Sequence, residues 1–167
     1  AFIPIFWTRE LGTSPEQGSF ALTVFFSIGI FMTYIGGLLG DKYGPIKIIR
    51  LSLLVWLPAM FLLTEVPTFS PLIMMPIAYL LLLMIGAAKA ISYSPVIVLG
   101  QTYLAKSIGF ASGITLGVSQ TIGGVIAPVV GNLADTYSLP VAMMTLVPFL
   151  VMGLGASLIL KDPKKLH

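Results

Sequence analysis

A lysine inside a long apolar segment is the residue of this chain best suited to bind a charged ligand. Lys89 lies in the stretch LLLLMIGAAKAISYSP, which contains no carboxylate that could pair with it. Burying an ammonium group at the centre of a membrane helix costs at least about 2.5 kcal/mol on insertion scales. Three interpretations are open: the stem reaches the membrane interface, the ammonium faces a hydrated cavity, or it binds an anion from a substrate or another part of the protein.

The other candidate cavity residues are polar and uncharged. Gln120 and Ser119 lie side by side in a later apolar segment, Tyr93 follows Lys89 by one helical turn, and Tyr34 lies in an earlier segment. A buried amide or hydroxyl group needs a hydrogen-bond partner, which a neighbouring helix or a bound solute can provide. We expect these side chains to line a cavity, with interhelical bonding as the alternative for Gln120.

The composition gives little support to catalysis. The chain has no cysteine, its one histidine is His167 at the end, and no aspartate or glutamate lies in the middle of an apolar segment. Thiolate nucleophiles, metal clusters and paired acid–base groups are therefore not expected. We predict a protein that binds or moves a small molecule without a metal or cofactor, and not an intramembrane enzyme.

A charged cluster follows the first long apolar segment. Asp41, Lys42, Lys47 and Arg50 surround Gly44, which with the proline after it favours a tight turn. The Asp41 carboxylate could accept hydrogen bonds from the unpaired N–H groups at the start of a neighbouring helix. Lys47 and Arg50 lie near the start of their own helix, where the helix dipole disfavours cations. We therefore expect them to orient the chain or to bind a partner, and a purely solvated loop is the alternative.

The elements that position these residues are long apolar segments. Hydrophobic residues make up 57% and charged residues 9% of the 167 residues, whereas a soluble domain carries about 25% charged residues. A membrane helix needs about 20 apolar residues, and a barrel strand would be half as long and alternating. We predict an all-α integral membrane protein, one bundle over residues 1–167, with five full spans and an N-terminal helix stub that is the cut end of a further span. The expected ranges are 1–7 (stub), 19–40, 46–64, 72–99, 109–134 and 141–160.

The distribution of basic residues predicts the orientation in the lipid bilayer. If the spans alternate in direction, every basic residue except Arg9 and Lys89 falls on one side of the membrane. The positive-inside rule makes that side cytoplasmic, and the C-terminus with it. The net charge of +3 is thus explained by topology, and no basic stripe interleaved with aromatic residues predicts nucleic-acid binding.

Small residues and prolines recur inside the predicted spans. Gly37-x-x-x-Asp41-x-Tyr43 and Gly131-x-x-x-Asp135-x-Tyr137 match each other three spans apart, which predicts inverted three-helix repeats, with chance as the alternative because glycine is abundant. Small residues at four-residue spacing predict close helix packing, and helix sliding during a transport cycle is equally consistent with them. Prolines inside spans predict kinks; they are Pro58, Pro76, Pro95, Pro128 and Pro148.

We expect Trp7 to anchor at the membrane interface. Phe25, Phe26 and Phe31 are expected to face lipid or to pack between helices.

Two of these patterns resemble motifs of the major facilitator superfamily. Its signature loop runs roughly G-x-x-x-D-[RK]-x-G-[RK]-[RK]; Gly37, Asp41, Lys42 and Gly44 match, whereas Pro45 and Ile46 replace the final basic pair. The span 109–134 resembles the antiporter-type motif G-x-x-x-G-P-x-x-G-G. Gly123, Pro128 and Gly131 match this second motif, and Ala127 and Asn132 replace two of its glycines. The stretch 100–113 also resembles fosmidomycin-resistance-type drug exporters.

The resemblance implies half of a 12-helix fold in the plasma membrane, with this chain as helices seven (the stub) to twelve. A missing N-terminal six-helix half would be the partner, and the two halves would rock about a small-molecule substrate by alternating access. Asp41 would latch the cytoplasmic side. The implied function is proton-coupled export of a drug or organic anion, a phosphonate included, with the proton gradient as energy source. The coupling group would lie in the absent half, or Lys89 would serve. Uptake of an organic anion and a non-transporting scaffold or sensor are the alternatives.

Overall fold

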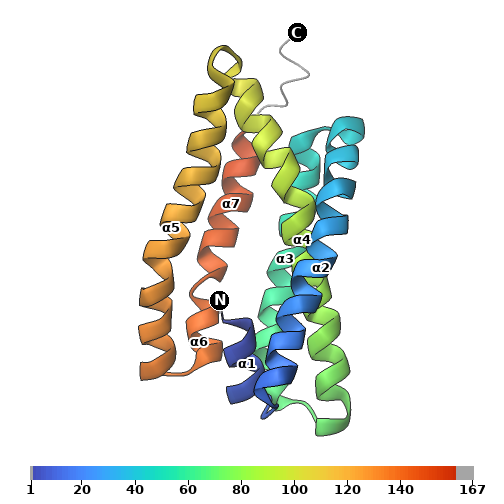
Figure 1. Cartoon of the computed structure of the whole chain (residues 1–167), viewed down its shortest axis with the longest axis vertical. Helices are drawn as coiled ribbons and strands as arrows, with labels where there is room; N and C mark the ends of the chain where they lie inside the picture. The colour runs from blue at the N-terminus through green and yellow to red at the C-terminus, as the bar shows by residue number, and fades with distance from the viewer. Residues whose placement is uncertain (1, 161–167) are drawn as a thin grey trace.

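The computed structural model describes residues 2–160, and within this range the chain is built of helices joined by short turns (Figure 1). The basic residues predicted in the C-terminal tail lie outside the described residues. The helices are α1 (Ile3–Arg9), α2 (Pro15–Tyr43), α3 (Pro45–Glu65), α4 (Pro71–Tyr103), α5 (Ile108–Thr136), α6 (Leu139–Met144) and α7 (Val147–Ile159). Two short 3-10 turns, η1 (Val66–Thr68) and η2 (Ala105–Ser107), join α3 to α4 and α4 to α5.

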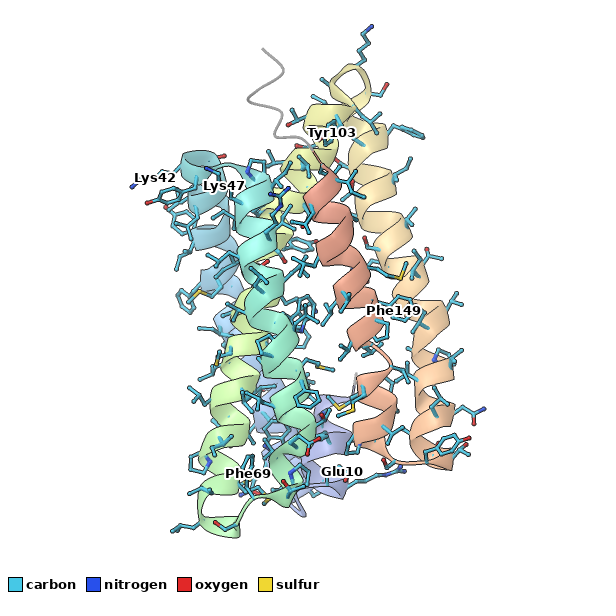
Figure 2. All side chains as sticks on the ribbon, turned by 180° about the vertical axis from the view of Figure 1, so that it is seen from behind. Glu10, Lys42, Lys47, Phe69, Tyr103 and Phe149 are labelled. Carbon is cyan, nitrogen blue, oxygen red and sulfur yellow. The ribbon has the colours of Figure 1, made fainter. Side chains whose placement is uncertain are left out.

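Five of the described segments are long and apolar enough to cross a membrane, which confirms the all-α class and the number of full spans. They are Pro15–Tyr43, Pro45–Thr68, Leu72–Tyr103, Ala105–Thr136 and Leu139–Ile159. The long helices run up and down, so that the α2–α3 and α4–α5 turns lie at one end of the bundle (Figure 1). Lys42 and Lys47 mark that end in Figure 2, and Glu10 and Phe69 mark the other. α2 and α5 end at opposite ends of the bundle, as the repeated Gly-x-x-x-Asp-x-Tyr pattern predicts.

Proline and serine residues begin several helices. Pro15 and Pro45 occupy first-turn positions, where a missing N–H costs no intrahelical bond. The Ser14 hydroxyl accepts a hydrogen bond from the Gln17 N–H, 3.4 Å away, and caps α2. Gly44 alone separates α2 from α3, with a φ of +95° that favours glycine. The predicted loop at 41–45 is therefore a single residue, because Asp41 and Lys42 continue the last turn of α2.

The last predicted span contains a break. Residues 145 and 146 separate α6 from α7, and Pro148 lies in the first turn of α7. Pro148 has no N–H to donate to the carbonyl four residues earlier, and its ring would clash with that carbonyl in a continuous helix. The kink expected at this proline is thus a full interruption, whereas α3, α4 and α5 continue through their interior prolines.

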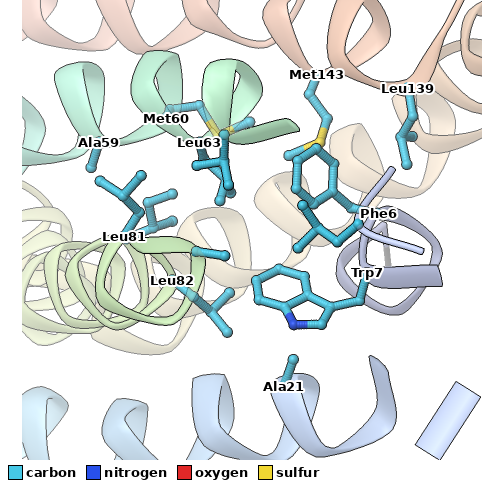
Figure 3. Close-up of a cluster of buried hydrophobic side chains, with 14 residues drawn as sticks. Phe6, Trp7, Ala21, Ala59, Met60, Leu63, Leu81, Leu82, Leu139 and Met143 are labelled. Atoms are coloured by element: carbon cyan, nitrogen blue, oxygen red, sulfur yellow. The ribbon is translucent and has the colours of Figure 1, made fainter. Parts of the chain in front are cut away.

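The largest buried cluster lies where α1 packs between the long helices, and Figure 3 shows its side chains. Phe6 and Trp7 of α1 are completely buried against Leu63 of α3, Leu82 of α4 and Met143 of α6. Trp7 is therefore a core residue, and its predicted role as an interfacial anchor is wrong. The indole also packs edge-on against the Tyr79 ring, with 5.6 Å between centroids. Its Nε1–H has no hydrogen-bond partner among the described residues.

Glycines bring α2 and α4 into close contact. A Cβ atom on Gly36 would lie 2.7 Å from the Cα of Ile91, and one on Gly40 would lie 3.1 Å from the Pro95 ring. The glycines of α5 differ, since a Cβ atom on Gly123 or Gly131 would meet no described atom within 4 Å. The small-residue face of α2 is thus used inside this bundle, whereas the face of α5 is open.

Candidate solute-binding site

Lys89 lies near the middle of α4. About 27 Å of helix separates it from the start of α4 and about 21 Å from the end, so its stem cannot reach either end of the bundle. The ammonium Nζ lies 5.4 Å from the centroid of the Phe25 ring on α2, a cation–π contact. Within residues 2–160 this lysine forms no ion pair. The structure thus places a cation in the middle of the apolar part of the molecule, where it can attract an anion.

A small hollow lies between α2 and α4 beside Lys89. Its volume is about 270 Å³, and it is lined from both helices. The lining residues are Phe25, Phe26, Gly29, Ile30 and Thr33 of α2 and Gly86, Lys89, Ala90 and Tyr93 of α4. The Thr33 hydroxyl donates to the Gly29 carbonyl, 2.8 Å away. The hollow therefore combines one cation with aromatic rings.

A larger hollow, about 650 Å³, shares Lys89 and Phe25 with the first and is bounded by all seven α-helices. Its lining is mostly apolar and includes Trp56, Met60 and Phe149. Ser119 is its polar member on α5, and its hydroxyl donates to the Thr115 carbonyl of the preceding turn. Lys89 is consequently the only charged group among the described residues that line either hollow.

The predicted cavity residues separate into two groups. Lys89 and Tyr93 meet in the small hollow, and Lys89 and Ser119 meet in the large one. Tyr34, on α2, and Gln120, on α5, are exposed and are not among the lining residues of either hollow. Gly123 and Ala127 of the predicted packing motif line the large hollow, whereas Pro128 and Gly131 do not.

Sequence reasoning did not place two aromatic residues beside Lys89. Phe25 and Phe26 were expected to face lipid or to pack. Their rings do pack against each other, with 5.7 Å between centroids, but both also line the small hollow, and Phe25 contacts the ammonium. No spacing along the chain could reveal this, because Phe25 and Lys89 lie on different helices whose register is fixed only by packing. The close approach at Gly36 and Gly86 sets that register: a Cβ atom on Gly86 would lie 2.9 Å from Ile28.

The charged cluster lies at the end of the bundle that carries the α2–α3 turn. Gly37, Asp41 and Lys42 belong to the last two turns of α2, and Lys47 is exposed in the first turn of α3. The Lys42 ammonium lies 5.2 Å from the centroid of the neighbouring Tyr43 ring. These groups share one surface at the end of the bundle.

Arg50 has a partner inside this bundle. Its Nε donates to the Ser157 carbonyl, 3.0 Å away, and its Nη2 donates to the same carbonyl and to that of Leu160, the latter at 3.4 Å. These carbonyls lie at the end of α7, where a helix leaves its last four C=O groups without intrahelical partners. Arg50 therefore caps α7 and complements the negative end of its dipole.

An exposed ion pair lies at the opposite end of the bundle. The Arg9 guanidinium, at the end of α1, donates to the Asp135 carboxylate, at the end of α5, over 3.0 Å. Asp135 is the aspartate of the second Gly-x-x-x-Asp-x-Tyr copy, and Arg9 is the basic residue predicted alone on this side. The sequence did not predict their pairing, which depends on how α1 packs beside α5 and α6.

Comparison with known proteins decides the family. The sequence model of the Major Facilitator Superfamily matches residues 1–167. The chain belongs to the major facilitator superfamily. Membership agrees with the multi-pass helical architecture and points to a membrane transporter rather than an enzyme.

One relative is the "Uncharacterized MFS-type transporter YfnC" of Bacillus subtilis (strain 168), 31% identical over 151 residues. The alignment covers 90% of this chain and 35% of the relative, so the chain spans about a third of the length of this major facilitator superfamily protein. No solved structure matches the chain. The comparisons do not reach the fosmidomycin-resistance-type branch, which stays a prediction.

Proposed function

We propose that the complete protein is a secondary transporter of the plasma membrane that moves a small solute by alternating access, with Lys89 on the solute path. The observation that carries this proposal is the position of Lys89, a cation near the middle of a membrane helix that borders two hollows and has no ion-pair partner in residues 2–160. Lys89 is exposed on the isolated bundle, but at this depth in a membrane a cation without a carboxylate is costly, and a bound anion would remove that cost.

The cargo and coupling follow from the same residues. A cation at the hollows favours an organic anion, and the antiporter-type motif at Gly123 to Asn132 favours export driven by the proton gradient, without a metal or organic cofactor. No aspartate or glutamate lies in the middle of the described spans, so the proton carrier would be Lys89 or a group in the rest of the protein. The other six-helix half would complete the solute path.

The charged end of the bundle supports a conformational role. Asp41, Lys42 and Lys47 form an exposed surface around the buried turn residue Gly44. We assign this surface to the cytoplasmic side together with the C-terminus. In the proposed cycle this surface latches the cytoplasmic entrance against the other half. Arg50 would hold α7 to α3 while the latch opens and closes.

Transport by the complete protein in vesicles tests the proposal. A panel of organic anions, cations and neutral drugs would be followed with an imposed pH gradient of either sign and with none. Export coupled to protons predicts accumulation of an anion against its gradient in one gradient direction only, and the opposite direction would indicate uptake by symport. Lys89→Met should reduce transport at least tenfold, whereas Lys106→Met, in the α4–α5 turn, should not. If no solute moves under any gradient, the protein is a scaffold or sensor.

A further inference from the structure

The geometry of the small hollow points to the class of solute: an aromatic molecule with a single negative charge, such as an arylcarboxylate. This inference rests on the proposed transport function and adds a selectivity to it. Three properties of the hollow carry it, namely its charge, the nature of its walls and its volume.

The charge of the hollow matches one negative charge. Lys89 is its only ionised lining group, and no carboxylate lines either hollow in the described part of the chain. A monoanion would neutralise the ammonium. A dianion would leave one charge without a partner in an apolar surrounding, which is strongly unfavourable. A neutral solute could accept a hydrogen bond from the ammonium but would leave its charge without a counter-ion.

The walls favour a flat aromatic body. Phe25 and Phe26 lie on the α2 side and Tyr93 on the α4 side, about one helical turn beyond Lys89. The ammonium already lies 5.4 Å from the Phe25 centroid, so the charge and a ring face are presented together. An arylcarboxylate can place its carboxylate on Nζ while its ring packs against Phe25 or Phe26. Aromatic pairs gain more than their buried area alone provides, whereas a saturated ring of equal size does not.

The volume limits the size of the solute. Drug-sized molecules occupy pockets of roughly 300–1,000 Å³, and this hollow has about 270 Å³. It therefore suits one or two fused rings with a carboxylate. Gly29 contributes to this space, since a Cβ atom there would meet only the Ala90 Cβ, at 4.0 Å. A larger side chain at Gly29 would fill the hollow without changing its charge.

Equilibrium binding to the complete protein in nanodiscs of neutral lipid tests the inference. The probes are benzoate, 2-naphthoate, phthalate as the dianion, cyclohexanecarboxylate as the saturated acid, and benzyl alcohol as the neutral ring. We expect 2-naphthoate and benzoate to bind at least tenfold more tightly than the other three. Lys89→Met and Gly29→Leu should each weaken 2-naphthoate binding at least tenfold. The matched changes Lys106→Met, in the turn, and Gly155→Leu, at an open position of α7, should leave it unchanged.

The outcomes separate this inference from the proposed function. Equal binding of phthalate or cyclohexanecarboxylate, or unchanged 2-naphthoate binding by Lys89→Met, would overturn the selectivity. If the vesicle assay finds a transported solute while no aromatic acid binds, transport stands and the inference fails. If 2-naphthoate binds with the expected variant pattern but no panel member, 2-naphthoate included, is moved, the proposed transport fails and the inference falls with it.

Discussion

The contact between α2 and α4 at Gly36 yields the sharpest prediction about stability. A Cβ atom on Gly36 would lie 2.7 Å from the Cα and 2.8 Å from the carbonyl carbon of Ile91. Both are backbone atoms, so no side-chain rotation can relieve the overlap. Ordinary van der Waals contact begins at about 3.5 Å between carbon atoms, and Gly36→Ala therefore requires α2 and α4 to separate by roughly 1 Å along this direction.

The cost of this separation can be estimated from related changes. Inserting a methyl group into a packed core costs about 1–3 kcal/mol, and the shared α2–α4 interface also positions Phe25 against Lys89. The opposing gain from replacing glycine in a helix is about 1 kcal/mol. We expect Gly36→Ala to lower the free energy of unfolding by up to about 2 kcal/mol, and Gly36→Val to lower it further.

Thermal unfolding of the complete protein in detergent, followed by size-exclusion chromatography of the heated samples, measures the effect. The matched control is Gly155→Ala in α7, where a Cβ atom would meet no described atom within 4 Å. We expect this control to be as stable as the unmodified protein or slightly more so. If Gly36→Ala and Gly155→Ala melt at the same temperature, α2 and α4 are not in the close contact described above.

Three further predictions concern residues whose partners lie on other helices. Arg50→Met removes the cap of α7 and should lower the free energy of unfolding by about 1–2 kcal/mol, with faster hydrogen exchange in the last turn of α7. Lys47→Met, at the exposed site nearby, is the control. Equal exchange rates in the two variants would contradict the cap. Trp7→Phe removes a buried N–H that has no described partner but keeps most of the ring. Thermal unfolding should therefore show a loss of stability below about 1 kcal/mol for Trp7→Phe and about 3–5 kcal/mol for Trp7→Ala. Similar losses for both variants would show that the N–H has a partner. The Arg9–Asp135 ion pair is exposed: the Arg9 side chain is 59% and the Asp135 side chain 70% accessible. A double-mutant cycle should therefore give a coupling energy below about 1 kcal/mol that falls with added salt. A larger coupling energy that does not depend on salt would refute a surface role.

Sequence reasoning predicted the elements of this fold because length and apolar composition are local properties. The spans, the tight turn at Gly44 and the effect of Pro148 all follow from residues within one segment. The core position of Trp7 did not, since burial depends on the helices that surround α1. The partners of Lys89, Arg50 and Arg9 lie on other helices, and a single sequence contains no signal for such pairs. Lys89 itself was predictable because a lone charge in an apolar segment is conspicuous without any knowledge of its neighbours.

The single-residue link at Gly44 has a mechanical consequence. A connection of one residue offers only two soft torsions, so any change in the angle between α2 and α3 must be made by the φ and ψ of Gly44. Arg50 lies about a turn and a half from the start of α3, and its guanidinium holds the end of α7. A displacement of α2 near Asp41 can therefore reach α7 through one glycine, the start of α3 and the hydrogen bonds of Arg50.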